Sequence, residues 1–294
     1  MFNRNNGNRG DVPVKDRNSV QYYGEVPMFS WIDLNPVELC NRTCFFCPRG
    51  HDYPNTNDHM DISTSSKLAD ELERVGYDGS INICGNGEPL LHYDITGLIE
   101  SLDGFYVMIV TNGDRLDKNA VYNLYESGLD HINVSLYDGE EQVGKFTELF
   151  DSMDVGGDRY TLRHYYRSDD LDYGMTGLNN RAGVIDFGDP EPDDNPCYYM
   201  HYSIMVDWNG DVLWCLQDVY GKVSTFGNVN EDSIMDIWTS DKMNNARKLL
   251  YKTRSKFTPC KDCNVEGTRY GENHVKEWVR GYEQFANQSI SNGT

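Results

Sequence analysis

The chain lacks long apolar runs and is poor in basic residues. Its 294 residues contain no run of about 18 apolar residues, the length that a membrane-spanning helix needs. The 26 Lys and Arg are outnumbered by 47 Asp and Glu, which gives a formal charge of −21. Phosphate binding needs clustered Lys and Arg, so we expect neither nucleic acid nor an anionic membrane surface as a partner. The charge favours a substrate that is small, or neutral to basic.

The first residues also lack the apolar segment of a secretory signal, so a cytoplasmic location is expected. We expect residues 1–29 to be a polar, partly disordered leader. In such a compartment, the eight cysteines indicate metal ligands rather than disulfides. Seven of them form two groups, and Cys84 is left over. We interpret Cys84 as a small buried residue; the alternative is a hydrogen donor of a radical epimerase.

Three cysteines, Cys40, Cys44 and Cys47, lie within eight residues. Structural zinc normally takes four N or S ligands, and no fourth cysteine or histidine follows at a matching distance, although His51 is near. Three thiolates can instead hold three irons of a cubane cluster and leave the fourth iron open. The spacing therefore favours an iron–sulfur cluster over a zinc knuckle or a chance group of buried cysteines.

Strand and helix patterns alternate through the first part of the chain. The predicted strands are 30–34, 80–83, 105–110, 131–136 and 160–166, and the predicted helices are 63–75, 95–102 and 118–126. Such alternation implies an α/β fold with a parallel sheet, here a partial (β/α) TIM-like barrel. We expect this barrel over 30–190, a small extension over 191–268 and a C-terminal helix and tail over 269–294.

In such a sheet the ligand lies at the carboxyl ends of the strands. The cysteine triad follows the first strand, Gly85-Asn86-Gly87-Glu88-Pro89 follows the second, and Asn112-Gly113 follows the third, while Ser135 closes the fourth. Glycines allow backbone carbonyl groups to approach a ligand, and Glu88 can accept a hydrogen bond from an ammonium group. The sequence therefore predicts one binding site at this edge of the sheet.

The Cys-x3-Cys-x2-Cys triad and the Gly-x-Gly-Glu-Pro run one strand later resemble the radical S-adenosylmethionine (SAM) superfamily. The resemblance implies that SAM closes the open iron and that this run binds SAM, with Asn86 at the variable first glycine. It also places Phe46 at the adenine side and Asn112 and Ser135 near the ribose, with Arg163 as a candidate for the SAM carboxylate. Each side chain also has an ordinary structural interpretation, such as local packing or ion pairing.

The C-terminal third holds four more cysteines, namely Cys197, Cys215, Cys260 and Cys263. Asn209-Gly210 predicts a hairpin turn that brings the first two together, and 234–238 predicts an apolar helix. The arrangement Cys-x12-Gly-x4-Cys, gap, Cys-x2-Cys resembles the twitch form of the SPASM extension, which holds one auxiliary four-iron cluster. A zinc ribbon is the alternative. Because four thiolates saturate a cubane, this site favours electron transfer over substrate binding at iron.

Together these resemblances identify a radical SAM enzyme with two [4Fe-4S] clusters, SAM, and an electron donor such as flavodoxin or ferredoxin. In the family, SAM cleavage yields a 5′-deoxyadenosyl radical that abstracts hydrogen from the substrate. The cysteine layout is most similar to twitch-type dehydrogenases that oxidise an aminocyclitol, 2-deoxy-scyllo-inosamine. The resemblance thus implies oxidation of a secondary alcohol in a sugar-like small molecule, with the auxiliary cluster as electron acceptor.

Arg181, Gln217 and His164 are candidates near the substrate, from position alone. Two other functions stay open. Other members with this extension modify peptides by thioether formation, crosslinking or epimerisation, but they often carry an N-terminal recognition domain, for which the 39 residues before Cys40 are short. A non-catalytic iron–sulfur interaction protein would leave the Gly-x-Gly-Glu-Pro run unexplained.

Overall fold

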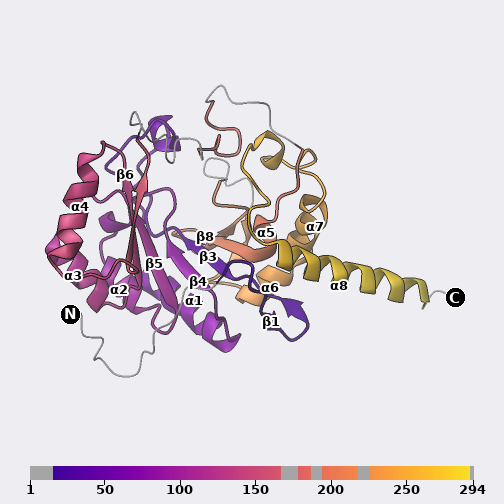
Figure 1. The fold of residues 1–294 in the computed structure, drawn as a ribbon. Helices are drawn as coiled ribbons and strands as arrows, with labels where there is room; N and C mark the ends of the chain where they lie inside the picture. Colours follow the sequence, from indigo (N-terminus) through magenta and orange to yellow (C-terminus); the bar gives the residue numbers. More distant parts are fainter. Residues whose placement is uncertain (1–15, 167–177, 187–193, 218–224, 292–294) are drawn as a thin grey trace.

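The computed structural model describes residues 16–166, 178–186, 194–217 and 225–291 (Figure 1). The first half of the predicted leader, the predicted boundary at 190 and the last three residues of the predicted tail lie outside these ranges. Residues 22–27 form a small antiparallel pair, β1 (Tyr22–Tyr23) and β2 (Val26–Pro27).

One open sheet of eight strands, in the order β10-β9-β8-β3-β4-β5-β6-β7, organises the described residues. Its strands are β3 (Trp31–Leu34), β4 (Ser80–Ile83), β5 (Tyr106–Thr111), β6 (His131–Leu136), β7 (Tyr160–His164), β8 (Ser203–Val206), β9 (Asp211–Leu213) and β10 (Thr225–Asn228). Strands β8, β3, β4, β5, β6 and β7 run parallel, whereas β9 and β10 are antiparallel additions. The predicted α/β fold with a partial, unclosed barrel is confirmed.

The helices of the described residues are α1 (Ile62–Arg74), α2 (Ile95–Glu100), α3 (Lys118–Glu126), α4 (Glu141–Asp151), α5 (Tyr199–Tyr202), α6 (Ile234–Thr239), α7 (Asp241–Leu250) and α8 (Glu272–Ser291). Helices α1 to α5 lie in the connections between the parallel strands, whereas α6, α7 and α8 follow the last strand, and α8 projects away from the sheet (Figure 1). Side chains of Asp61, Asp94 and Asp117 accept hydrogen bonds from the first turns of α1, α2 and α3, which satisfies otherwise unpaired N–H groups. Among the described helices, none combines the length and apolar character of a membrane span.

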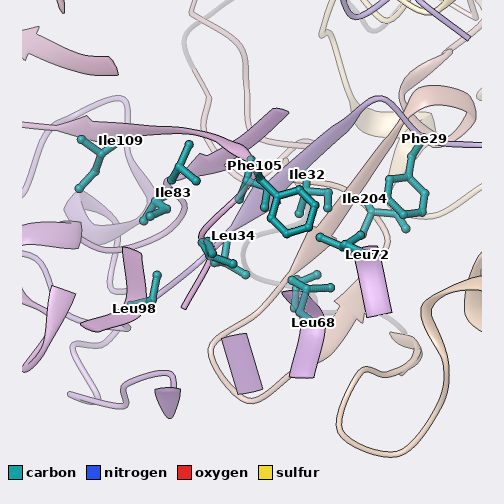
Figure 2. Packing of buried hydrophobic residues seen from close by; sticks show 14 of the residues in the cluster. Phe29, Ile32, Leu34, Leu68, Leu72, Ile83, Leu98, Phe105, Ile109 and Ile204 are labelled. Carbon is teal, nitrogen blue, oxygen red and sulfur yellow. The ribbon is translucent and has the colours of Figure 1, made fainter. Parts of the chain in front are cut away.

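The two faces of the sheet differ because successive strand residues point to opposite sides. On one face Ile32, Leu34, Ile83 and Ile109 are fully buried and pack with Leu68, Leu72 and Leu98 of the helices (Figure 2). On the other face the alternate positions are Trp31, Asp33, Asn82, Asn133 and Arg163, which line cavities. The sheet therefore separates an apolar core from a polar binding surface.

Most predicted elements occur where the sequence places them. Strands β4 and β6 and helix α3 have the predicted bounds, and the other predicted elements of the barrel shift by one or two residues at an end. The predicted hairpin forms between β8 and β9. Helices α4 and α7 were not predicted, because α4 contains Gly144 and α7 contains the consecutive Asn244 and Asn245, which weaken a helical pattern.

Strand β8 also pairs in parallel with β3, so the C-terminal extension continues the main sheet. The buried Arg247 of α7 stabilises the packing around this strand pair, because its side chain contacts α5, α6 and α8. Its guanidinium lies 3.7 Å from the Trp238 ring centre and 4.2 Å from that of Trp278, and it donates to the carbonyls of Met200 and Trp238, each at 2.8 Å. Burial lowers the pKa of Arg247 to about 9. The extension is thus continuous with the barrel rather than hinged to it.

Candidate active site

The cysteine triad lies on the loop that follows β3, at the carboxyl edge of the sheet. The loop is turned by hydrogen bonds from Cys47 N to the Cys44 carbonyl (2.9 Å) and from Gly50 N to the Cys47 carbonyl (2.8 Å). All three thiols are partly exposed. Burial raises the pKa of Cys44 to about 11 without a metal, so iron must displace the thiol protons when it binds. Three unpaired thiols on one tight loop fit the three protein ligands of an open cubane cluster.

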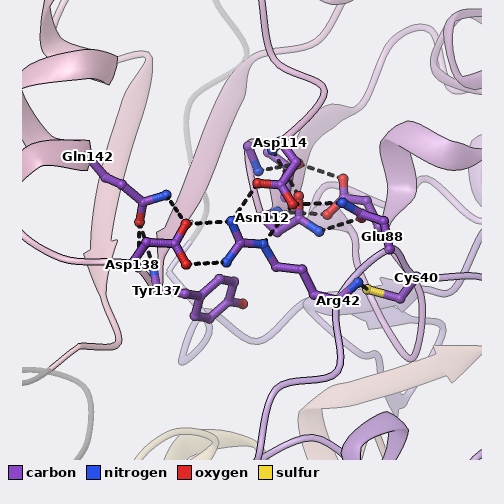
Figure 3. A network of polar contacts seen from close by, with 11 residues as sticks. Cys40, Arg42, Glu88, Asn112, Asp114, Tyr137, Asp138 and Gln142 are labelled. Carbon is purple, nitrogen blue, oxygen red and sulfur yellow. Dashed lines mark hydrogen bonds and ion pairs between the residues drawn. The ribbon is translucent and has the colours of Figure 1, made fainter.

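Arg42, inside the triad, fastens this loop to the ends of two strands (Figure 3). Its guanidinium makes two hydrogen bonds to Asp114 after β5, at 2.5 and 2.7 Å, and two to Asp138 after β6, at 2.6 and 2.7 Å. Gln142 orients Asp138 by donating to it at 2.9 Å. Such paired, charge-assisted bonds fix direction as well as distance. The cluster loop is therefore positioned by the parallel strands that it covers.

Glu88 is buried at the end of β4 and already has three protein donors. It accepts hydrogen bonds from Leu90 N (3.0 Å), Thr111 Oγ1 (2.6 Å) and Asn112 N (2.7 Å). Burial raises the pKa of Glu88 to about 7 despite these bonds. A carboxylate offers about four acceptor positions, so one remains for an ammonium group. The structure thus adds a role that the sequence did not predict, because Glu88 joins the ends of β4 and β5.

The two glycines beside Glu88 are required by contacts within the chain. Gly85 has φ +147°, and a Cβ there would meet the Asn35 side chain at 2.5 Å. A Cβ at Gly87 would lie 2.0 Å from the Val37 carbonyl. Packing against the cysteine loop is therefore a sufficient reason for these glycines, besides the ligand approach expected from the sequence.

An aromatic group lies next to the triad. The ring of Phe46 is buried and stacks on Tyr165 at a centroid distance of 5.7 Å, with Tyr137 at 5.6 Å. Ser135 is also buried and stands opposite Arg163 in the register of β6 and β7. Tyr137 and Tyr165 thus place Phe46 near the ends of β6 and β7, and the roles of Phe46, Ser135 and Arg163 in SAM binding stay a prediction.

The four C-terminal cysteines come from separate segments and meet at one cavity. Cys197 precedes α5, Cys215 follows β9, Cys260 begins the short helix η3 (Cys260–Asp262), and Cys263 follows it. All four line a single small cavity with Trp214 and Met200. Burial raises the pKa of Cys197 to about 11 and of Cys260 to about 12 in the absence of a metal.

Hydrogen bonds to sulfur are already in place at this cavity. Trp214 Nε1 donates to Cys260 Sγ at 3.1 Å, and the Gln217 backbone N donates to Cys215 Sγ at 3.3 Å. Within the described residues, no three His, Cys, Asp or Glu side chains surround a position for a single ion. A cubane needs no such convergence, because each thiolate binds a different iron. Four thiols around one apolar cavity fit such a cluster.

Two adjoining cavities, of about 720 and 300 Å³, cover the polar face of the sheet. Both are lined by Arg17, Trp31, Asn82, Arg163, Leu178, Asn179, Tyr199 and Gln217. The smaller cavity reaches Cys47, Gly85 and Asn86, and thus the triad. Tyr199 and Gln217 also line the cavity of the four C-terminal cysteines. The binding space therefore extends from one cysteine site to the other.

The predicted substrate residues have different outcomes. Arg181 and Gln217 line the smaller cavity and touch each other, with Arg181 Nη1 donating to Gln217 Oε1 at 3.0 Å. His164 is next to Arg163 on β7, so it points to the opposite face, beside Tyr166. It lines neither cavity. Phe46, Gly87, Glu88, Pro89, Asn112 and Ser135 are likewise outside the lining of these two cavities.

Sequence reasoning missed Asp33, Asn82, Arg17 and Tyr199. Asp33 and Asn82 occupy alternate positions of predicted strands, so counting the second face of each strand would have found them. Asp33 Oδ1 accepts hydrogen bonds from Trp31 Nε1 (2.9 Å) and Asn82 Nδ2 (2.8 Å). Arg17 and Tyr199 carry no local sequence signal, because remote segments bring them to the cavity.

Cys84, the cysteine outside both groups, is buried below the smaller cavity. Its sulfur accepts a hydrogen bond from Asn82 Nδ2 at 3.0 Å and lies 3.4 Å from Asp33 Oδ1. Burial raises its pKa well above the usual value, so the group is a neutral thiol.

Comparisons with known proteins agree with this geometry. Residues 34–152 match the family described as the radical SAM superfamily, and residues 197–264 match SPASM, an iron–sulfur cluster-binding domain. The SAM-dependent 2-deoxy-scyllo-inosamine dehydrogenase of Niallia circulans is 30% identical over 244 residues, which cover 81% of this chain and 93% of that protein. The chain therefore belongs to the radical SAM superfamily, and it is an enzyme whose cofactors are SAM and [4Fe-4S] clusters.

Solved structures extend the likeness to the fold. BtrN in complex with AdoMet and 2-DOIA superimposes with a TM-score of 0.71 at 28% identity, covering 84% of this chain and 98% of that one. The anSMEcpe structure with bound AdoMet and the Cp18Cys peptide reaches 0.50 at 14% identity, covering 89% and 98%, which shows the fold alone. A probable GTP 3′,8-cyclase of Methanopyrus kandleri is 37% identical over 106 residues, which span 36% of this chain and 33% of that protein.

Proposed function

We propose that this enzyme oxidises a secondary alcohol of a small polyol or aminocyclitol to a ketone. The observation that supports it is the pair Tyr199 and Gln217, which line both the binding cavities and the cavity of the four C-terminal cysteines. An alcohol oxidation of this class has to pass an electron from substrate to an acceptor, and here Tyr199 and Gln217 adjoin both the binding space and the second cysteine site. The relative from Niallia circulans, a dehydrogenase, supports the same reaction.

When bound, the cofactors supply a hydrogen-abstracting radical at the triad and an electron acceptor at the second cysteine site. The chain's residues position the reactants. We assign SAM to the edge formed by Phe46, Gly85 to Pro89, Asn112 and Ser135, with Arg163 toward its carboxylate. Arg181 and Gln217, which hold each other, contact the substrate. His164, on the other face of β7, is left out of the proposed site.

The reaction also needs an acceptor for the hydroxyl proton. Asp33 is 5% exposed and lines the smaller cavity, and its Oδ1 is held by Trp31 and Asn82. Among the described residues that line this cavity, Asp33 is the carboxylate. We therefore assign the proton to Asp33. Electrons for SAM cleavage would come from a small carrier such as flavodoxin or ferredoxin, and the substrate would be a small molecule rather than a nucleic acid.

The test uses 2-deoxy-scyllo-inosamine carrying deuterium at the reacting carbinol carbon, with anaerobically reconstituted, reduced enzyme and SAM. We expect deuterium in 5′-deoxyadenosine and the ketone as product, both followed by mass spectrometry. The Cys260→Ala/Cys263→Ala variant should still transfer deuterium but form no ketone. A folded double variant that makes ketone at the native rate would remove the second cysteine site from the reaction.

Cys84→Ala is the matched control, because it removes a thiol outside both cysteine sites. We expect it to keep both label transfer and ketone formation. Loss of turnover with full iron content would instead support a radical epimerase that uses Cys84 as hydrogen donor. If the enzyme turned over neither the aminocyclitol nor related polyols but did modify a peptide, peptide modification would replace alcohol oxidation as the proposed function.

A further inference from the structure

Three arginines line the larger cavity: Arg17, Arg163 and Arg269. None of their guanidinium groups has an ion pair within the described residues. By contrast, Arg42 pairs with Asp114 and Asp138, and Arg49 pairs with Glu38 at 2.8 Å. The carboxylate that lines this cavity is Glu266, which is solvent-exposed and makes no ion pair. A chain of formal charge −21 thus has a cavity with a surplus of positive charge.

Arg17 is held in place by ring contacts and by its backbone, and within the described residues its side-chain N–H groups have no hydrogen-bond acceptor. Its guanidinium carbon lies 3.5 Å from the Trp31 ring centre and 4.8 Å from that of Tyr270, so it contacts two aromatic rings. The backbone around it is fixed as well. Ser30 Oγ donates to the Arg17 carbonyl at 3.0 Å, and Asn18 Oδ1 accepts from Gly271 N at 2.8 Å. As far as the described part of the chain shows, the N–H donors of this oriented, permanently charged group stay available for a ligand.

Arg269 lies over the same tyrosine ring, with its guanidinium carbon 5.5 Å from the Tyr270 centre. The two guanidinium groups thus share one aromatic neighbour at the wall of the cavity. Arg163 contacts a different ring, with its guanidinium carbon 5.5 Å from the Tyr165 centre, and it also lines the smaller cavity, as Cys47 does. This position agrees with its assignment to SAM and leaves Arg17 and Arg269 without a ligand.

Both guanidinium groups approach the Tyr270 ring, at 4.8 and 5.5 Å, so an anion that binds at this wall of the cavity would lower the repulsion between the two positive charges. Planar guanidinium groups bind carboxylate and phosphate oxygens in pairs, which gives such an anion a defined orientation. Asp33 does not fill this role, because it belongs to the smaller cavity and its Oδ1 already accepts from Trp31 and Asn82. A neutral or cationic substrate would leave both arginines uncompensated.

We infer that the substrate carries an anionic group, a carboxylate or a phosphate monoester, which Arg17 and Arg269 bind in the larger cavity. This inference rests on the proposed function and narrows its substrate to an anionic polyol, either a sugar acid or a sugar phosphate. It differs from the neutral to basic substrate that the overall charge favours, because the cavity has a local charge opposite to that of the whole chain. The aminocyclitol in the test of that function then serves as a probe of the reaction and not as the preferred substrate.

The test measures binding rather than turnover. Reconstituted, unreduced enzyme with SAM bound is titrated calorimetrically with inorganic phosphate, acetate, glucose 6-phosphate, glucuronate and glucose. We expect at least one anionic sugar to bind about tenfold more tightly than glucose. The phosphate and carboxylate arms show which anion is preferred. In Arg17→Gln/Arg269→Gln this preference should disappear, whereas Arg115→Gln, an exposed arginine outside both cavities, should keep it.

Two milder variants distinguish a specific loss of anion binding from misfolding of the double variant. Arg269→Gln alone removes an exposed side chain and should lose part of the preference, and Arg17→Lys keeps the charge but loses the paired donors. Glucose binding as tight as that of the anions, no binding of any anion at 20 mM, or a preference that survives the folded double variant would each overturn the inference. Normal oxidation of a neutral polyol with no anion binding would contradict the inference about the anionic group and still support the proposed function. Anion binding without alcohol oxidation would support the inference about the anionic group and contradict the proposed function.

Discussion

The two cysteine sites are built in opposite ways. The first takes Cys40, Cys44 and Cys47 from one short loop that is partly exposed. The second takes Cys197, Cys215, Cys260 and Cys263 from three separate segments around an apolar cavity. A local site can be lost without much effect on the fold, because the strands below it stay paired. A site that joins distant segments acts as a crosslink, so its metal contributes to the stability of the extension. Removal of the first site should therefore abolish activity with little effect on stability, whereas removal of the second site should also lower stability.

The largest expected effect is on activity. Changing Cys40, Cys44 and Cys47 together to Ala should lower bound iron from about eight to about four per chain, since two cubanes carry about eight irons. Formation of 5′-deoxyadenosine should fall to background, because SAM then has no cluster. The melting temperature should change by less than about 2 °C. Full iron content in the triple variant would contradict the assignment of the site.

The second effect is on stability. Cys260→Ala/Cys263→Ala removes two of the four ligands that join η3 to α5 and β9. A loss of roughly 2 kcal/mol or more should lower the melting temperature by about 4 to 8 °C, followed by circular dichroism under anaerobic conditions. The triple variant of the first site is the matched control. Equal melting temperatures for the two variants would show that the second site is not a crosslink.

Glu88 gives a pH-dependent effect at the first site. Burial raises its pKa to about 7 in the folded chain, above its value of 4.5 when exposed. The folded state therefore binds the proton more tightly than the unfolded state, and stability should fall as the pH rises from about 4.5 to about 7. The Glu88 share is at most about 3 kcal/mol. Urea unfolding at several pH values checks this against Glu88→Gln, which should lack that share. SAM affinity should increase with pH through about 7 in the wild type but not in the variant.

The smallest effect concerns the electronic properties of the second site. Trp214→Phe removes the donor at 3.1 Å from Cys260 Sγ. Hydrogen bonds to sulfur stabilise the reduced cluster, so its reduction potential should fall by roughly 40 mV, equivalent to about 1 kcal/mol. Potentiometric titration followed by electron paramagnetic resonance measures the shift. Trp208→Phe is the control, and a similar shift there would mean that the indole of Trp214 has no specific role.

The contrast between the sites also explains what could be predicted. The triad, the run Gly85 to Pro89 and strands β4 and β6 depend on residues close together in the sequence, so spacing and periodicity identify them. His164 shows that position in the sequence is not enough to predict a substrate contact. Its neighbour Arg163 lies in the cavity, but alternation along β7 turns His164 to the other face. The sequence also did not reveal that Gly85 and Gly87 are required by the cysteine loop packed against them.

Residue types and spacing alone were enough to predict cysteine ligands, the alternation of strand and helix, and the edge of the sheet that carries the first cysteine group. Each follows from local residue types, because thiolates, glycines and alternating apolar residues act over a few positions. Three features became known only from the folded chain. Strand β8 continues the main sheet beside β3, and Tyr199 and Gln217 line both the binding cavities and the cavity of the C-terminal cysteines. Arg17 also contacts the Tyr270 ring. Those contacts join residues far apart in the chain, and no local pattern records which distant surface a segment will pack against.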